Sequence, residues 1–232
     1  MELVEKLQNV KPKKRTSALE GYHHSMGYAV MLLPFSTGHM LALRRFHESS
    51  ISPYVSVWHC NPEGEWSIYN DGPSLETTCP RWWGPALIKA ELTDIRLHWM
   101  DSNTLRVTME KPSLEWTLSI KPSSGLLNLV NNVNTKIPYR FLRSGFMRRI
   151  QEVMARYVFN LGDLNFSFIT PTQKDAMIVM EAFYYIDDSK AIWQGEDLGE
   201  QINLKRNPSI GNIALPRIPS FVTVHAFEKK RN

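Results

Sequence analysis

Four polar side chains lie close to aromatic residues in a pattern that could support acid–base chemistry. His59 ends an apolar run, Asp94 and His98 share one side of an alternating segment, and Glu115 sits in a further alternating segment. A histidine or carboxyl group that pointed into an apolar interior could act as a general acid or base. Burial would also raise the pKa of such a carboxyl group. A solvated strand face is the commoner arrangement, so these four residues are candidate catalytic residues only.

The aromatic residues offer a second kind of chemistry, which is the binding of an apolar molecule. Six of the seven tryptophans fall between Tyr54 and Ile120. Large, stiff aromatic side chains suit half-buried sheet surfaces and can form the wall of a cavity. We therefore expect the ligand-binding residues to be Trp58, His59, Trp66, Trp82, Trp83, Trp99 and Trp116.

The pair Trp82-Trp83 differs from the other tryptophans in its surroundings. Pro80, Gly84 and Pro85 flank the pair, and two prolines with a glycine do not fit a regular central strand. The two indoles therefore form either a structural plug or a lid over a cavity.

Standard catalytic and cofactor motifs are missing from the chain. It contains no phosphate-binding glycine loop, no dinucleotide fingerprint, no zinc-spaced cysteines and no nucleophile elbow. We expect no cofactor and no metal ion. Nucleic acid is not an expected partner either, because no known binding module is recognisable.

The elements that would position these residues are mostly strands. Apolar and polar residues alternate in 92–100, 105–109 and 114–120, with turn residues between them, which predicts an antiparallel meander. Further strands are expected at 27–34, 39–48, 54–60, 65–69, 165–169, 176–186, 191–193 and 221–227, with a hairpin at Asp187-Asp188-Ser189-Lys190. The fold class is mainly β, a closed or nearly closed antiparallel barrel of about ten strands, since closure removes exposed edges, and a split sandwich is the alternative.

Residues 124–160 interrupt this pattern with helical spacing. Apolar residues recur there on one face of the expected helices, and six basic residues accompany one acid. We expect the apolar stripe to pack against the barrel and the basic side chains to face outward. A solvated helix face is the default interpretation, and an anionic membrane surface is the alternative partner, through Arg140, Arg143, Arg148 and Arg149.

Length and composition indicate one globular unit. The chain has 232 residues, of which 43% are hydrophobic and 22% charged. We expect an N-terminal arm at 1–20 and a single β-barrel domain at 21–232. No secretory signal is recognisable, and the two cysteines, Cys60 and Cys79, are more typical of free thiols than of a disulfide framework. We therefore expect a cytoplasmic protein, and peripheral membrane association is the alternative.

The aromatic hairpins and the block from Phe183 to Gly195 resemble the lipocalin-like (calycin) barrels, in particular a divergent bacterial group that includes relatives of carotenoid hydratases and tocopherol cyclases. The resemblance covers residues 27–227 and is architectural. Gly27-Tyr28-Ala29 stands where typical lipocalins have Gly-x-Trp, and the helical insert is a further departure. The resemblance implies a cavity for an apolar molecule, and it transfers no catalytic residue.

Three hypotheses for function follow from these patterns. The first is binding of a small hydrophobic ligand in an aromatic-lined cavity. The second is a cyclase, isomerase or hydratase that uses an interior carboxylate or histidine as the acid. The third is a peripheral membrane or scaffolding protein that docks through the basic helices.

Overall fold

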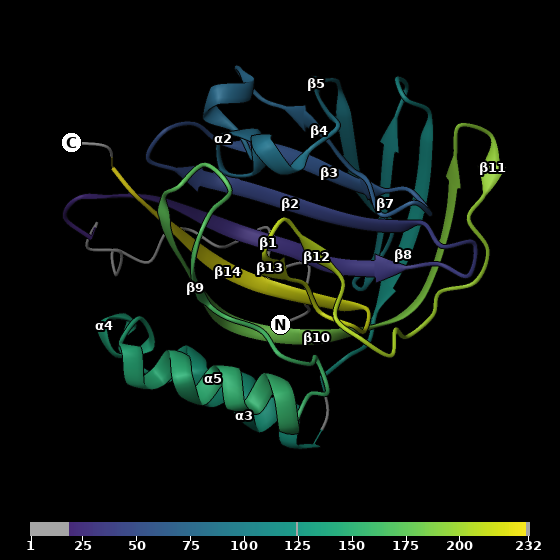
Figure 1. Cartoon of the computed structure of the whole chain (residues 1–232). Coiled ribbons are helices and arrows are strands. Elements are labelled where there is room, and N and C mark those ends of the chain that lie inside the picture. Colours follow the sequence, from purple (N-terminus) through teal and green to yellow (C-terminus); the bar gives the residue numbers. More distant parts are fainter. Residues whose placement is uncertain (1–18, 124, 231–232) are drawn as a thin grey trace.

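The computed structural model describes residues 19–123 and 125–230, so the expected arm at 1–20 lies almost entirely outside the described residues. One large curled sheet dominates the described chain (Figure 1). Its strand order is β5-β4-β3-β2-β1-β14-β10-β8-β7-β6, and β9 and β11 also pair with β10. The prediction of a mainly β protein is confirmed.

The strands follow the alternating segments of the sequence closely in the first half of the chain. Their bounds are β1 Tyr22–Pro34, β2 Met40–Ser49, β3 Tyr54–Cys60, β4 Trp66–Asp71, β5 Lys89–Leu92, β6 Ile95–Trp99, β7 Thr104–Met109, β8 Leu114–Ile120, β9 Ser167–Ile169, β10 Asp175–Trp193, β11 Glu196–Asp197, β12 Ser209–Ile210, β13 Ile213–Ala214 and β14 Ser220–Lys229. The helices are η1 Leu75–Thr77, α2 Pro80–Trp83, η2 Gly84–Ala86, α3 Gly125–Lys136, α4 Tyr139–Leu142 and α5 Gly145–Tyr157.

Strand β10 is bent and belongs to both halves of the sheet. Its first half pairs with β14 and its second half pairs with β8, with a bulge between Ile186 and Asp188. The predicted hairpin at 187–190 is therefore wrong. The polar residues that suggested a turn are a bulge, where Asp187 and Asp188 are exposed while Ser189 is buried. Bulges bend a strand and increase its twist, which lets one long strand serve both halves of the sheet.

The expected closed antiparallel barrel is also wrong in two respects. Strands β4 and β5 are parallel, because the connection through η1, α2 and η2 crosses over before β5 begins. Within the described chain, β5 and β6 are not paired with each other, so the sheet forms a half-barrel. Bulky apolar side chains from both halves, including Trp116, Trp193 and Phe221, fill the space between the halves, which pack face to face.

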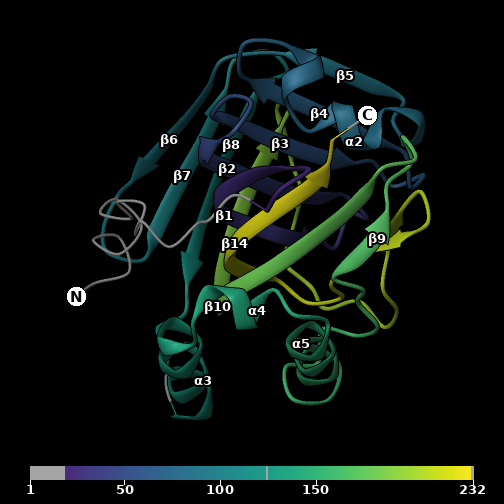
Figure 2. The same cartoon turned by 90° about the vertical axis from the view of Figure 1, so that its left-hand side faces the viewer.

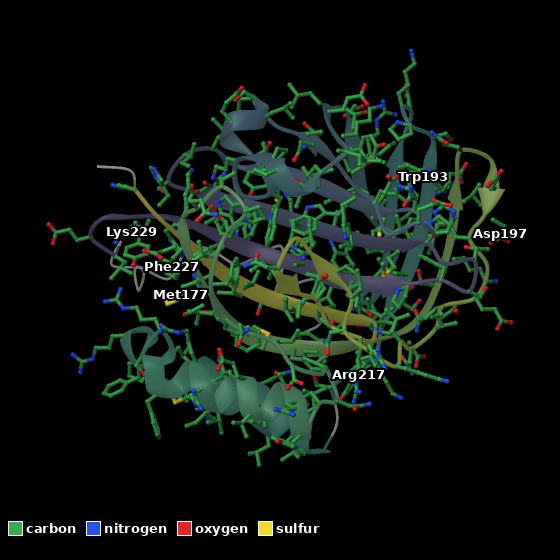
Figure 3. All side chains as sticks on the ribbon, viewed as in Figure 1. Met177, Trp193, Asp197, Arg217, Phe227 and Lys229 are labelled. Atoms are coloured by element: carbon green, nitrogen blue, oxygen red, sulfur yellow. The ribbon has the colours of Figure 1, made fainter. Side chains whose placement is uncertain are left out.

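The sheet formed by β1–β4, β14 and β10 consequently has two buried faces (Figure 2). Strands β6–β8 cover what we call the enclosed face, whose core includes Leu43, Val57 and Trp116. Helix α2, the segment 159–168 and the segment 210–218 cover the opposite side, which we call the cavity face. Successive residues of one strand therefore enter different cores. A smaller third cluster lies where Met177 and Phe227, paired across β10 and β14, pack with Leu142 (Figure 3).

Helices α3 and α5 lie beside β10 (Figures 1 and 2), along the stretch of its edge between β9 and β8. Buried amides make the attachment: Asn131 bonds both the N–H and the C=O of Phe183, and Gln151 Nε2 donates to the C=O of Met180 at 2.9 Å. These bonds satisfy backbone groups that no neighbouring strand pairs.

The prediction that the apolar stripe packs against the barrel is right only in part, since Val130, Ile137 and Leu142 pack against the sheet and other residues of the stripe do not. On α5, Phe146 is 75% exposed, Val153 51% and Tyr157 72%, while Gln151 and Ala155 are the buried residues. The arginines divide as well: Arg140 and Arg149 are exposed, whereas Arg143 and Arg148 are half-buried. The open strand edge needs hydrogen bonds as well as apolar contacts, and the two amides therefore share the inner face with Val130, Met154 and Ala155.

Candidate functional site

Strand β3 sends alternate side chains into the two cores. Tyr54 and Trp58 lie on the cavity face, and Val57 and Val55 lie on the enclosed face. The side chain of His59 also lies on the enclosed face, because its ring stacks on that of Trp193 (labelled in Figure 3) with 4.0 Å between the ring centroids. The residue pair Trp58-His59 thus does not line one site.

A cavity of about 90 Å³ lies on the cavity face. Its walls come from β1, β2, β3, α2, β10, β13, β14 and the segment 164–168. Most of the lining is apolar or aromatic, and Trp58, Trp82 and Trp83 meet there. The ring of Trp83 lies edge-on to Trp58 at 5.3 Å and stacks on Phe168 at 5.9 Å.

One charged side chain, Arg44, enters this lining. The guanidinium donates to the C=O groups of Val30, Leu43 and Met31, the last at 3.2 Å. Register shifts on both sides of β1 around Val30 mark a bulge that frees such groups. The Arg44 Cζ atom also lies 4.4 Å from the centroid of the Trp58 ring, a cation–π distance. Burial lowers the pKa of Arg44 to about 10.

Other polar groups of the lining are weakly partnered or neutral. The Nε1 atom of Trp58, a residue only 2% exposed, is buried and has no hydrogen-bond partner among the described residues. The Cys79 Sγ atom lies 3.6 Å from the hydroxyl of Tyr54. Burial, together with Cys79, raises the pKa of Tyr54 well above its usual value, which keeps the phenol neutral.

Helix α2 is held over the cavity by a buried carboxylate on β14. Glu228 accepts hydrogen bonds from Arg81 Nε and Trp82 Nε1, each at 2.6 Å, and from Lys174 Nζ. Burial alone would raise the pKa of Glu228, but the hydrogen bonds from Lys174 and Arg81 lower it below its usual value. The charge of Glu228 is thus compensated, and the network fixes Trp82 and Trp83 in place.

The remaining predicted site residues lie elsewhere. Trp66 packs edge-on against Trp58 at 6.4 Å, but its Nε1 donates to the C=O of Ser209, outside the lining. Trp99 and Trp116 belong to the enclosed face. Asp94, His98 and Glu115 are exposed on the outer side of β6–β8, where Arg96 pairs with Asp94 and Arg106 with Glu115.

Arg44 is the cavity residue that the sequence analysis missed. It sits in β2 with the apolar Ala42 and Phe46 on its side of the strand and Leu43 as its neighbour. An arginine on an apolar strand face is the available signal, because a solvated face would carry further polar residues there.

Four of the histidines form two pairs. His39 Nδ1 lies 2.8 Å from His59 Nε2, and His24 Nε2 lies 2.9 Å from His225 Nδ1. Burial, with a smaller effect of the second histidine, lowers the pKa of both His24 and His59 to about 4. Among residues 19–123 and 125–230, no group of three or more histidines, cysteines and acids could hold a metal ion.

Comparisons with known proteins give no match: no family model, no curated protein and no solved structure is similar to this chain. In the described ranges, no helix combines the length and apolar character needed to cross a membrane.

Proposed function

We propose that this protein binds a small hydrophobic molecule in the cavity between Trp58, Trp82 and Trp83. The observation that carries the proposal is the lining, which is almost entirely apolar and brings together side chains from both ends of the chain. Apolar cavities of this kind stay dry and take up apolar guests. The lipocalin-like character of the curled sheet is part of the same proposal.

The cavity size limits the ligand. At about 90 Å³ it is smaller than the sites that enclose drug-sized molecules, which are roughly 300 Å³ or more. The ligand is therefore small, or one end of it enters while the rest extends past the cavity wall. A chain end or a single ring fits this description.

Binding is a better match to the cavity than acid–base catalysis. The ionisable side chains of the described lining are Arg44, Tyr54 and Cys79, and neither a carboxylate nor a histidine is among them. A cyclase, isomerase or hydratase would need an acid of moderate pKa at the reacting atom. The location of the protein is part of the same proposal. Both cysteines are buried free thiols, and free thiols are typical of a reducing compartment, which supports the proposed cytoplasmic location.

The test is a titration of the protein with alkanols and small aromatic hydrocarbons, followed by tryptophan fluorescence and calorimetry. Ala214, half-buried on β13, lines the cavity. Ala214→Leu should block it and reduce affinity by about tenfold or more. Ala90→Leu on β5, outside the lining, is the matched control and should bind as the original protein does. Absence of binding across the panel, or equal loss in both variants, contradicts the proposal.

The helices α3–α5 favour a second function, peripheral docking on an anionic membrane. Because Asn131 and Gln151 make the attachment to β10, large apolar side chains remain exposed on all three helices. These are Leu126, Leu129, Val133, Phe141, Phe146, Val153 and Tyr157. Exposed Arg140 and Arg149 accompany them. Apolar and basic residues on one helical surface are typical of interfacial helices, and each basic residue near an anionic surface contributes about 1 kcal/mol.

Liposome pelleting tests this second function. Vesicles that contain phosphatidylglycerol should retain the protein, and neutral phosphatidylcholine vesicles should retain much less. Phe146→Ser should weaken retention by several-fold, whereas Ile88→Ser, which alters an equally apolar residue that is 62% exposed, should not. Retention that is indifferent to lipid charge argues against membrane docking.

A further inference from the structure

The cavity lining contains a positively charged group but no negatively charged group, and this imbalance indicates the chemical class of the ligand. Among the described residues that line it, Arg44 is the single charged side chain, and no aspartate or glutamate accompanies it. No ion pair between residues that the structure describes involves Arg44 either. Arg44 is half-buried, and an arginine in an apolar surrounding is ordinarily paired with a carboxylate, because an uncompensated charge there is costly. The cavity therefore holds a positive charge without its counter-ion.

The donors of Arg44 are only partly used. A guanidinium carries five N–H groups, and the three carbonyl acceptors occupy both hydrogens of Nη1 and one of Nη2. One Nη2 hydrogen and the Nε hydrogen remain. They are the two donors that a carboxylate engages side-on.

A third donor lies on the same wall. Trp58, stacked under the guanidinium, has a buried Nε1 that bonds to no described group. A buried N–H without an acceptor is destabilising, because the group has lost its hydrogen bond to water. Arg44 and Trp58 lie in contact and carry three donors with no described acceptor, so a ligand with two oxygen atoms can engage more than one of them.

We infer that the ligand is an apolar molecule with one carboxylate, which binds Arg44 side-on and accepts from Trp58 Nε1. This inference rests on the proposed function and names the class of molecule that the cavity takes. A carboxylate supplies two oxygens in the plane of the guanidinium and one negative charge. A phosphate monoester fits less well, because its second charge would stay uncompensated in an apolar lining.

The structural role of Arg44 does not account for its charge. Capping the carbonyls freed by the β1 bulge needs N–H donors, and a neutral amide also supplies these. Those same bonds hold the guanidinium in one orientation before any ligand arrives, which reduces the entropic cost of binding. The bulge thus positions the anion-binding group.

The experiment compares three probes of equal chain length on the unmodified protein: octanoic acid, octanol and methyl octanoate. Calorimetry at neutral pH should give an affinity for the acid about tenfold or more above that for the other two. Equal affinities for all three overturn the carboxylate inference while the hydrophobic site stands. Binding of none of them overturns the proposed function itself.

Two variants locate the effect. Trp58→Phe keeps a ring in the wall but removes the N–H, and it should reduce the preference for acid over octanol several-fold. Trp66→Phe, the matched control, removes an indole whose N–H bonds Ser209 outside the lining and should leave the preference unchanged. Arg44→Gln should abolish the preference. If Arg44→Gln does not fold, Trp58→Phe still decides: an undiminished preference in that variant overturns the assignment.

Discussion

Trp58 and Trp116 lie on opposite faces of the same sheet. The two cores differ in whether the N–H group of the buried indole has a hydrogen-bond partner. Both indoles are almost fully buried, at 2% and 0% exposure. The Nε1 of Trp116 donates to Ser189 Oγ at 2.8 Å, whereas the Nε1 of Trp58 has no described partner and its ring borders a cavity. On the enclosed face the polar atom of the indole is satisfied within the fold. On the cavity face the same atom has no described partner, and the proposed ligand would supply one.

The ionisable residues repeat this contrast. His59 on the enclosed face is kept neutral by burial, and Arg44 on the cavity face keeps its charge although burial lowers its pKa. One face minimises charge, and the other retains a cation that no described carboxylate neutralises. If the proposed binding function is right, stability and binding depend on different sides of one sheet.

The largest expected effect is on the enclosed face. Trp116→Ala should lower the free energy of unfolding by about 3–5 kcal/mol, because it removes a fully buried indole and leaves a void. Trp58→Ala should cost less, since that ring already borders empty space. Urea unfolding at neutral pH measures both, and an equal or greater cost at Trp58 would contradict the division between the faces.

The next effect is a pH dependence that arises on the enclosed face. His59 has a folded pKa of about 4 against an ordinary 6.5, so the unfolded chain takes up the proton first as the pH falls. The stabilisation is complete above pH 6.5 and is lost towards pH 4, by up to about 3 kcal/mol. His59→Phe should flatten this part of the stability profile. His98→Phe, at an exposed position of β6, should leave the profile unchanged.

The sequence predicts the strands well where one strand has one set of neighbours. Alternation in 105–109 and 114–120 corresponds to the β7–β8 pair and to its buried side. The prediction from sequence fails at Asp187-Asp188, the site of the expected hairpin, because bulges and turns contain the same kinds of polar residue. Which one forms depends on β8 and β14, the two partners of β10, and these lie far away in the sequence.

The candidate site is less predictable for a related reason. The helical periodicity of 124–160 is real, but part of the stripe points outward because a free edge of β10 takes Asn131 and Gln151. Tryptophans are grouped in the sequence, yet strand alternation divides them between two cores. The position of Arg44 depends on a bulge in β1, and local composition carries no signal for that bulge.

A smaller effect separates the two indoles directly. Trp116→Phe should cost about 1 kcal/mol beyond the lost apolar contact, because its bond to Ser189 is removed. Trp58→Phe removes an N–H that has no partner, so the relief of its desolvation penalty offsets the lost contact. The difference between the two variants, about 1–2 kcal/mol, is measurable by thermal unfolding. Equal costs would mean that Trp58 Nε1 is satisfied in solution.

The last comparison concerns two carboxylates whose locations differ, and the smallest effect of all is expected at the exposed one, Glu115. Glu115 is 61% exposed and pairs with Arg106 at 2.9 Å, and exposed ion pairs contribute about 0–1 kcal/mol. Glu115→Gln should therefore change stability by less than about 1 kcal/mol and leave ligand binding unaltered. Glu228→Gln, at a carboxylate that is 1% exposed, leaves Arg81 and Lys174 uncompensated and should cost about 3 kcal/mol or more. It should also weaken binding, because α2 loses its anchor over the cavity. If Glu115→Gln abolished binding while Glu228→Gln did not, the functional site would lie on the outer side of β6–β8 and the cavity would be structural.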